Sequence, residues 1–257
     1  MRAELALPVP TLYGFLLVLT RVGAALVFVP LPGVRQGPEA ARVVLALSLT
    51  IVLFPEWPAI DAIPSMGQLT GWLLAEATLG ILFGVLVGFL AEAMQVAAQA
   101  VGLEAGFAYA SMVDPQTQAD SGVLLVFAQL AAGMLFFSLG LDREVVRAFA
   151  RSLETFPPGA VLAPAPAMEV LLRLGGGMFS TGIRLALPCP ALLALVDISL
   201  ALVGRLNAQL QLLTLAFPLK MLAAVLVLAW LMPVFPRVLG AYGDQIMSGL
   251  RAVIEHR

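Results

Sequence analysis

The chain has 257 residues, of which 61% are hydrophobic and 12% are charged, and its formal net charge is −2. Soluble domains are about half apolar and about a quarter charged, so this composition indicates an integral membrane protein, and the charge offers no basic surface for nucleic acid. The only histidine is His256 and the only cysteine is Cys189, which disfavours a histidine-dependent enzyme, a metal site or an intramolecular disulfide within the apolar body.

Six apolar segments follow one another along the chain, and they predict an all-α integral membrane fold built from helical hairpins with kinked or re-entrant segments. The third segment exceeds the roughly 20 residues that one bilayer crossing requires. Pro188 and Pro190 are expected to kink or divide the fifth segment. The six segments are Thr11–Pro30, Val43–Phe54, Gly71 to about Tyr109, Gly122–Leu141, Met168–Gly204 and Leu206–Val234.

An amphipathic helix is predicted at about residues 142–154, between the fourth and fifth segments. Val145, Phe149 and Leu153 recur there at helical spacing, and arginines occupy the other face. Such a helix either lies at a membrane interface or caps the helical bundle toward solvent. The sequence leaves both readings open.

The distribution of arginine predicts the orientation in the membrane, because cytoplasmic loops are enriched in Lys and Arg. The loop arginines, with the exception of Arg205, fall on the cytoplasmic side if residues 71–121 enter and return as a re-entrant helical hairpin. The N-terminus is then predicted to lie outside and the C-terminus in the cytoplasm.

A glycine stripe occupies the third segment. Gly80, Gly84 and Gly88 recur every four residues and let another helix approach closely, and Glu76 and Glu92 extend the same stripe. Carboxylates at that depth are expected to face a polar seam, a partner or water. The stripe serves either an interface in an assembly or packing within this chain.

The stretch GFAYASMVDPQTQADSG, from Gly106 to Gly122, interrupts the apolar pattern without a basic residue. Asp114-Pro115 ends the preceding helix, because the residue before proline is disfavoured in the α conformation. Irregular backbone at membrane depth is tolerated only inside protein or beside water. The stretch is therefore either an ordinary outside loop or a constriction in a pore.

Isolated charges also interrupt the apolar segments, and they offer an alternative function. They are suited to an ion relay in a small-molecule or ion secondary transporter, or to pairing with other residues and subunits. Lys220 lies in the middle of the last segment and is expected to pair or to face water. The charges are Arg21, Arg173, Arg184, Asp197 and Lys220.

The chain resembles the FliR family of flagellar export-gate proteins, with the SctT proteins of type III secretion as close relatives. The resemblance rests on ordered motifs over nearly the whole length: RVGAALVFVPLPG, QVAAQAVGLEAGFAYASMVDPQTQADSGVL, TFPPG, GGMFSTGIRLALPCPALLALVDISLALVGRLNAQLQ and FPLK. One departure precedes the last apolar segment, where relatives commonly carry Pro-Gln-(Leu/Met)-Asn and this chain has Ala208, Gln209, Leu210 and Gln211.

The resemblance implies a single export-gate domain over residues 1–257, with a first part to residue 167 and a C-terminal hairpin part from residue 168. It implies a channel subunit at the flagellar basal body in the bacterial inner membrane, with no enzymatic activity and no cofactor. The implied partners are several copies of the smaller FliP-type and FliQ-type proteins, a FlhB-type switch protein and unfolded export substrates.

The resemblance also implies that Gly106–Gly122 projects into the channel and helps to plug it. Phe107, Tyr109 and Met112 would then form an apolar closure, since hydrophobic constrictions gate by dewetting. Gly106 and Gly122 would act as hinges. Whether the apparatus is flagellar or of the injection type is left open by the resemblance.

Overall fold

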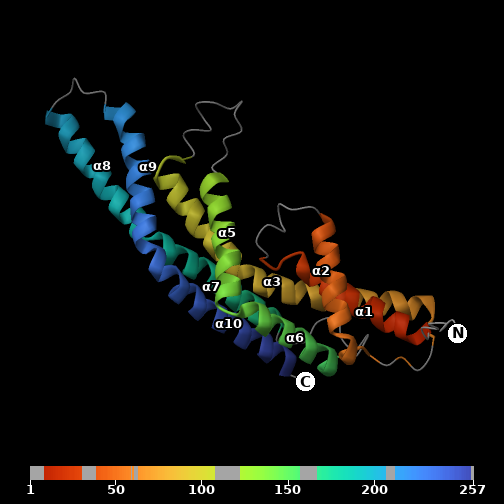
Figure 1. Ribbon diagram of the computed structural model, residues 1–257. Coiled ribbons are helices and arrows are strands. Elements are labelled where there is room, and N and C mark those ends of the chain that lie inside the picture. The colour runs from red at the N-terminus through yellow and green to blue at the C-terminus, as the bar shows by residue number, and fades with distance from the viewer. Residues whose placement is uncertain are drawn as a thin grey trace. The chain divides into compact units, whose positions relative to one another are not determined.

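The computed structural model describes residues 9–30, 39–58, 60, 63–107, 122–156, 167–206 and 212–255. All regular structure in these ranges is helical, and the chain is an all-α integral membrane protein (Figure 1). The elements are α1 Val9–Leu26, α2 Glu39–Val52, η1 Phe54–Glu56, α3 Met66–Glu104, α5 Gly122–Ser138, α6 Leu141–Thr155, α7 Ala167–Ala186, α8 Pro188–Leu206, α9 Leu212–Leu231, η2 Met232–Val234 and α10 Phe235–Glu255.

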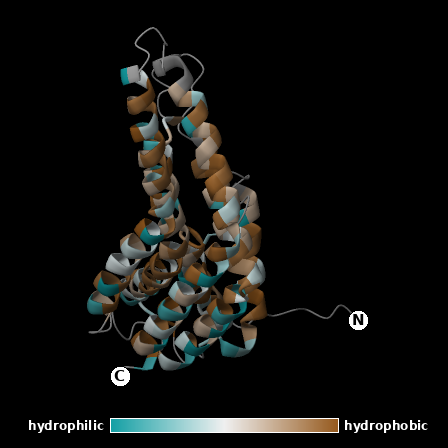
Figure 2. Ribbon diagram, turned by 90° about the vertical axis from the view of Figure 1, so that its left-hand side faces the viewer, coloured by the Kyte–Doolittle hydropathy of each residue, from teal (hydrophilic) through white to brown (hydrophobic). Residues whose placement is uncertain are grey.

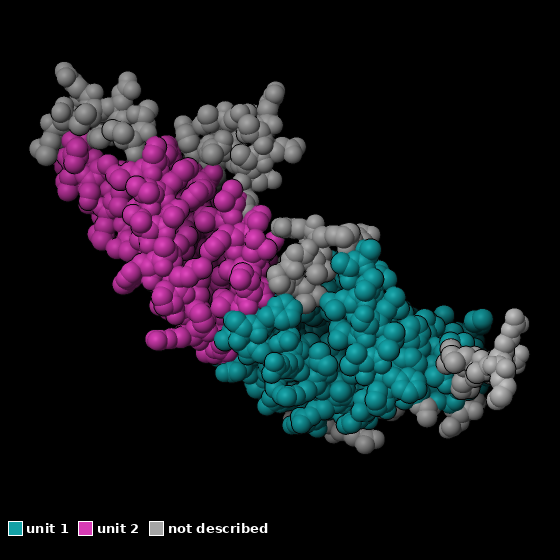
Figure 3. Space-filling view, in the orientation of Figure 1, with its two compact units in different colours: residues 1–89, 136–175, 243–257 teal, residues 90–135, 176–242 magenta. Residues whose placement is uncertain are grey.

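The chain forms two compact units, coloured separately in Figure 3. Unit 1 comprises residues 1–89, 136–175 and 243–257, and unit 2 comprises residues 90–135 and 176–242. The boundaries fall inside α3, α5, α7 and α10, so each of these helices contributes residues to both units.

Within the described ranges, three helical stretches are long and apolar enough to cross a membrane: Met66–Glu104, Pro188–Arg205 and Ala216–Glu255. A fourth is added if α5 and α6, which meet at a bend of 69°, count as one broken span. Hydrophobic residues predominate along the long helices, with isolated hydrophilic residues among them (Figure 2). The isolated polar residues are therefore the positions that need an explanation.

In unit 1, helix α1 packs against the glycine stripe of α3. A Cβ atom added at Gly80 would lie 2.2 Å from the carbonyl oxygen of Arg21, and one at Gly84 would lie 2.4 Å from the carbonyl oxygen of Ala25. A Cβ atom at Gly88 would lie 2.9 Å from the carbonyl oxygen of Phe28. Only glycine permits backbones to approach so closely. The stripe thus serves packing within the chain.

The prediction of a re-entrant hairpin over residues 71–121 is wrong, because α3 runs unbroken for 39 residues from Met66 to Glu104. At about 1.5 Å per residue, this helix is about 58 Å long, nearly twice the thickness of a bilayer core of about 30 Å. The helix contains no proline, and α1 covers its central glycines. Nothing in this range interrupts the helix before Glu104.

The amphipathic helix predicted at 142–154 is confirmed as α6. Its buried face carries Val145, Phe149 and Leu153, and the Phe149 ring packs on Phe83 of α3 with a centroid separation of 5.9 Å. The apolar face is therefore covered by the chain itself. This contact favours the cap of a helical bundle over a helix lying on lipid.

In unit 2, the expected break at the prolines is present. α7 ends at Ala186 and α8 begins at Pro188, because Pro188 and Pro190 lack the N–H groups that a continuous ladder requires. α8 and α9 pack against each other as an antiparallel pair (Figure 1).

Helix α10 lies beyond the last apolar segment that the sequence predicts, which ends at Val234. The signal for α10 was a helical repeat of apolar residues, and these side chains are buried in the structure: Leu239, Tyr242, Ile246, Leu250 and Val253.

Candidate functional site at the base of the Gly106–Gly122 segment

The segment from Gly106 to Gly122 leaves α3 through a left-handed turn. Gly106 has φ +81°, a conformation that residues other than glycine adopt at a cost. The backbone N–H of Gly106 donates to the carbonyl of Leu103 at 3.3 Å, and that of Ala105 donates to Val101 at 2.8 Å. These bonds close the last turn of α3 in the manner of a glycine C-cap.

The turn is packed against α9. A Cβ atom added at Gly106 would lie 2.8 Å from Cδ1 of Phe217, so the aromatic ring occupies the space that a larger residue would need. Phe217 opens the motif FPLK inside α9. The base of the segment is therefore held between the end of α3 and the first half of α9.

Lys220 closes the same motif and joins three helices. Its Nζ atom donates to Oδ2 of Asp197 on α8 at 2.8 Å, and it lies 3.7 Å from Oε1 of Glu104, the last residue of α3. The Lys220 side chain is 14% exposed, whereas Asp197 and Glu104 are 45% and 42% exposed. Partly exposed pairs of this kind contribute little stability each. They link α3, α8 and α9 at one point.

The other residues predicted for the plug and the charge cluster do not all lie at this base. Phe107 follows the turn and is half-buried, and Gly122 is the first residue of α5. Arg184 is exposed on α7 and takes no part in the Lys220 ion pairs. Four further predicted plug residues lie outside the described part of the chain: Tyr109, Met112, Asp114 and Pro115.

A second polar cluster is buried in unit 1. The Arg21 guanidinium forms a bidentate pair with Glu76, with Nε–Oε2 at 2.5 Å and Nη2–Oε1 at 2.9 Å. It also donates to Ser152 Oγ and to the carbonyl of Phe156, each at 3.0 Å. Arg21 and Glu76 are 1% and 2% exposed. The cluster ties α1, α3 and α6 together, and its sealed surroundings favour structure over ion relay.

Arg21 and Glu76 were singled out separately from the sequence and were not paired with each other. The signal that could have paired them is their charge: each interrupts an apolar helix, and an unpaired charge is costly at such a position.

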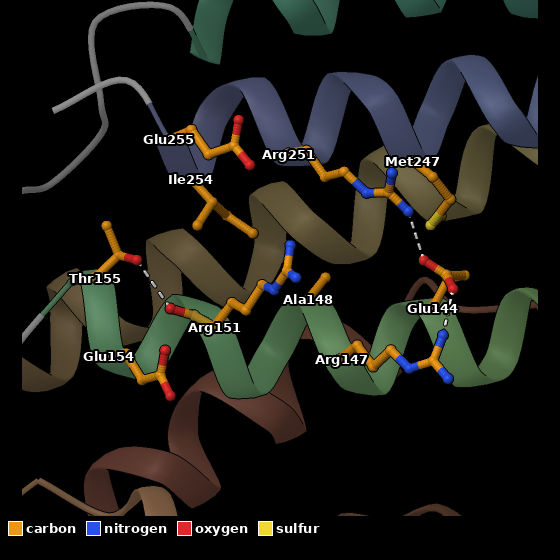
Figure 4. A pocket seen from close by; sticks show the side chains of 10 residues that line it. All are labelled: Glu144, Arg147, Ala148, Arg151, Glu154, Thr155, Met247, Arg251, Ile254 and Glu255. Carbon is orange, nitrogen blue, oxygen red and sulfur yellow. Dashed lines mark hydrogen bonds and ion pairs between the residues drawn. The ribbon is translucent and has the colours of Figure 1, made fainter.

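A groove of about 560 Å³ lies between α6 and α10 in unit 1 (Figure 4). Glu144 bridges its two sides, accepting hydrogen bonds from Arg147 at 2.6 Å and from Arg251 at 2.7 Å. All three side chains are partly exposed. The bridge fastens the C-terminal end of α10 to the amphipathic helix.

The charged groups of these clusters connect neighbouring helices. Among the described residues, no group of three or more His, Cys, Asp or Glu side chains gathers in a way that would hold a metal ion. The base of the Gly106–Gly122 segment offers a restrained turn, an aromatic contact and a lysine shared between two carboxylates.

A family model and individual proteins of similar sequence indicate the same family for this chain. Residues 12–246 match the family described as "Bacterial export proteins, family 1". The chain is 29% identical over 216 residues to the flagellar biosynthetic protein FliR of Escherichia coli K12, covering 84% of this chain and 82% of that protein. It is 27% identical over 224 residues to FliR of Bacillus subtilis 168, covering 84% of each. The chain therefore belongs to bacterial export protein family 1, the family of the flagellar biosynthetic protein FliR.

Proposed function

We propose that this chain is a channel-forming subunit of the type III export gate that builds the bacterial flagellum, that unfolded substrates pass through this gate, and that the segment Gly106–Gly122 plugs its channel. The observation that carries the proposal is the anchored turn at Gly106, held by Phe217 at the end of α3.

A plug needs a fixed base and a segment that can be displaced. The turn at Gly106 and the Lys220 pairs provide the fixed base, since they join α3, α8 and α9. The sequence between them and α5 supplies the apolar closure, with Phe107, Tyr109 and Met112. A closure of this kind excludes ions by dewetting and needs no charge.

Further support comes from the exposed apolar surface of α8 and α9. Several large side chains are more than half exposed there, which is typical of helices that meet lipid or other subunits. We propose that FliP-type and FliQ-type subunits, together with a FlhB-type protein, cover part of this surface in the inner membrane. The exposed side chains include Leu195 at 59%, Leu202 at 57%, Leu222 at 59%, Leu226 at 61% and Trp230 at 75%.

Ion leak tests the plug. Phe107, Tyr109 and Met112 are replaced together with alanine in cells that carry the complete apparatus, and the decay of the membrane potential is followed with a voltage-sensitive dye. The proposal expects faster decay than in the wild type, because three small side chains leave a wet passage. A matched triple replacement of exposed apolar residues in α7, Leu172, Phe179 and Ile183, controls for general damage. Equal decay in wild type and plug variant would refute the plug.

The predicted orientation, with the N-terminus outside and the C-terminus cytoplasmic, rested on a hairpin that α3 does not form. It is tested separately with Asp114→Cys, by labelling the introduced thiol from either side of the membrane. Labelling from the cytoplasm would contradict this orientation and leave the plug untouched.

A further inference from the structure

A short row of polar side chains crosses unit 2 beside the Gly106 turn. Glu92, Gln95 and Gln99 occur at positions i, i+3 and i+7 of α3 and therefore share one helix face. Gln129 is the only polar side chain of α5 between Gly122 and Phe137. We refer to these four residues as the amide row.

The amide row is connected by hydrogen bonds. The Gln95 amide donates through Nε2 to Oε1 of Glu92 at 2.9 Å, and its Oε1 accepts from Nε2 of Gln129 at 3.3 Å. α3 and α5 are the helices on either side of the Gly106–Gly122 segment. The one polar side chain in the apolar stretch of α5 thus meets the row on α3.

The row reaches the surface of the unit at Gln99. Glu92, Gln95 and Gln129 are half-buried and Gln99 is exposed. Gly102 and Val96 mark the flanks of this face, since Gly102 faces Leu124 of α5 and Val96 packs against Gly182 of α7. The row occupies the open strip of α3 between these two neighbours.

Contact with hydrocarbon is energetically unfavourable for a strip of polar side chains. Within the described part of the chain, no hydrogen bond joins the Gln99 side chain to another residue, and an amide without a hydrogen-bond partner is strongly disfavoured in an apolar medium. Carboxylates and amides at membrane depth are found facing the interior of a bundle or water. Gln99 therefore requires a polar surrounding that the described residues do not supply.

We propose that the amide row is part of the water-filled lining of the export channel, and this proposal rests on the proposed function. The row begins two helical turns before Gln99 and continues to within about 10 Å of Gly106 along the helix. It would present hydrated amides and a single carboxylate to the channel beside the plug. Amides form hydrogen bonds without selecting for charge, which suits an unfolded polypeptide of any sequence.

Thiol labelling tests the lining. Cys189 is fully buried and is first replaced with alanine, so that each introduced cysteine is the only thiol. Gln99→Cys is compared with Leu226→Cys, because Leu226 is 61% exposed on the apolar surface of α9. Both variants are examined in membranes that hold the assembled apparatus, with a charged, membrane-impermeant methanethiosulfonate reagent.

The lining predicts that the thiol of the Q99C variant reacts at least about tenfold faster than that of the L226C variant, because thiolate forms in water and is suppressed in hydrocarbon. A Q99C thiol that reacts no faster than the L226C thiol would overturn the proposal, whether both are slow or both are fast. Slow reaction of Q99C with the charged reagent, together with rapid reaction with a small neutral maleimide, would show that a partner subunit covers the row, and would also overturn it.

The two proposals fail separately. If the plug variant leaks and the Q99C thiol is inert, the channel stands and the lining is wrong. If the Q99C thiol reacts and the plug variant does not leak, the row is wet and the Gly106–Gly122 segment is not the seal.

Discussion

Replacing Gly84 with alanine tests the close approach of α1 to α3 directly. The added Cβ would lie 2.4 Å from the carbonyl oxygen of Ala25 and 2.8 Å from its Cα. Both are backbone atoms, so no change of rotamer relieves the clash. Since favourable contacts between heavy atoms lie near 3.5 Å, α1 and α3 must separate by about 1 Å at this point.

The expected loss follows from two opposing terms. Overpacking of this kind costs about 1–3 kcal/mol, with the upper end applying where backbone must move. Alanine recovers up to about 1 kcal/mol, because it favours the helix over glycine. Gly84→Ala is therefore expected to lower the free energy of unfolding by about 2 kcal/mol.

Gly71→Ala is the matched control, because it lies in the same helix and no atom falls within 4 Å of its added Cβ. That variant is expected to gain up to about 1 kcal/mol from helix propensity alone. Both are measured by titrating SDS into the protein in mild-detergent micelles. Trp57, which packs on Phe15 at a centroid distance of 5.3 Å, reports the unfolding of unit 1 by fluorescence. Equal stability of the two variants would refute the close approach of α1 to α3.

Three further predictions concern the polar clusters and the turn. Arg21→Met should lower the free energy of unfolding by about 3–5 kcal/mol, because it leaves the buried Glu76 carboxylate without a partner. The double variant Arg21→Met/Glu76→Leu should lose less stability than either single variant, because it leaves no unpaired buried charge. Strictly additive losses in the SDS titration would contradict this. Gly106→Ala should lose more stability than Gly140→Ala, since both glycines have positive φ but only Gly106 meets another side chain, Phe217; identical melting temperatures would exclude that contact. Lys220→Met should cost at most about 1 kcal/mol, because its acidic partners are nearly half exposed; a loss of about 3–5 kcal/mol in the same titration would show that the pairs are shielded from solvent.

Features that local chemistry determines could be predicted from the sequence. The helical character, the amphipathic α6 and the division at Pro188 each follow from periodicity or from a proline within a few residues. The pairing of Lys220 was also expected, since an isolated lysine within an apolar helix needs a partner or water.

Long-range contacts were beyond such reasoning. The glycines of α3 indicated a close approach, but no local signal named α1 as the helix that would approach. The same holds for Phe217, which covers Gly106 although it lies far along the chain. The distribution of arginine suggested a hairpin, together with a third segment longer than the roughly 20 residues that one crossing needs. Tertiary packing on α1 instead supports a single helix of 39 residues.

If this chain acts as one subunit within an export channel, it must be found in a defined complex, and native mass spectrometry can show this. The tagged chain is expressed with the membrane proteins encoded beside it and extracted in mild detergent. We expect one copy of this chain in a complex with several copies of smaller apolar subunits. A stable monomer or homodimer that carries none of them would show that the chain is not a channel subunit.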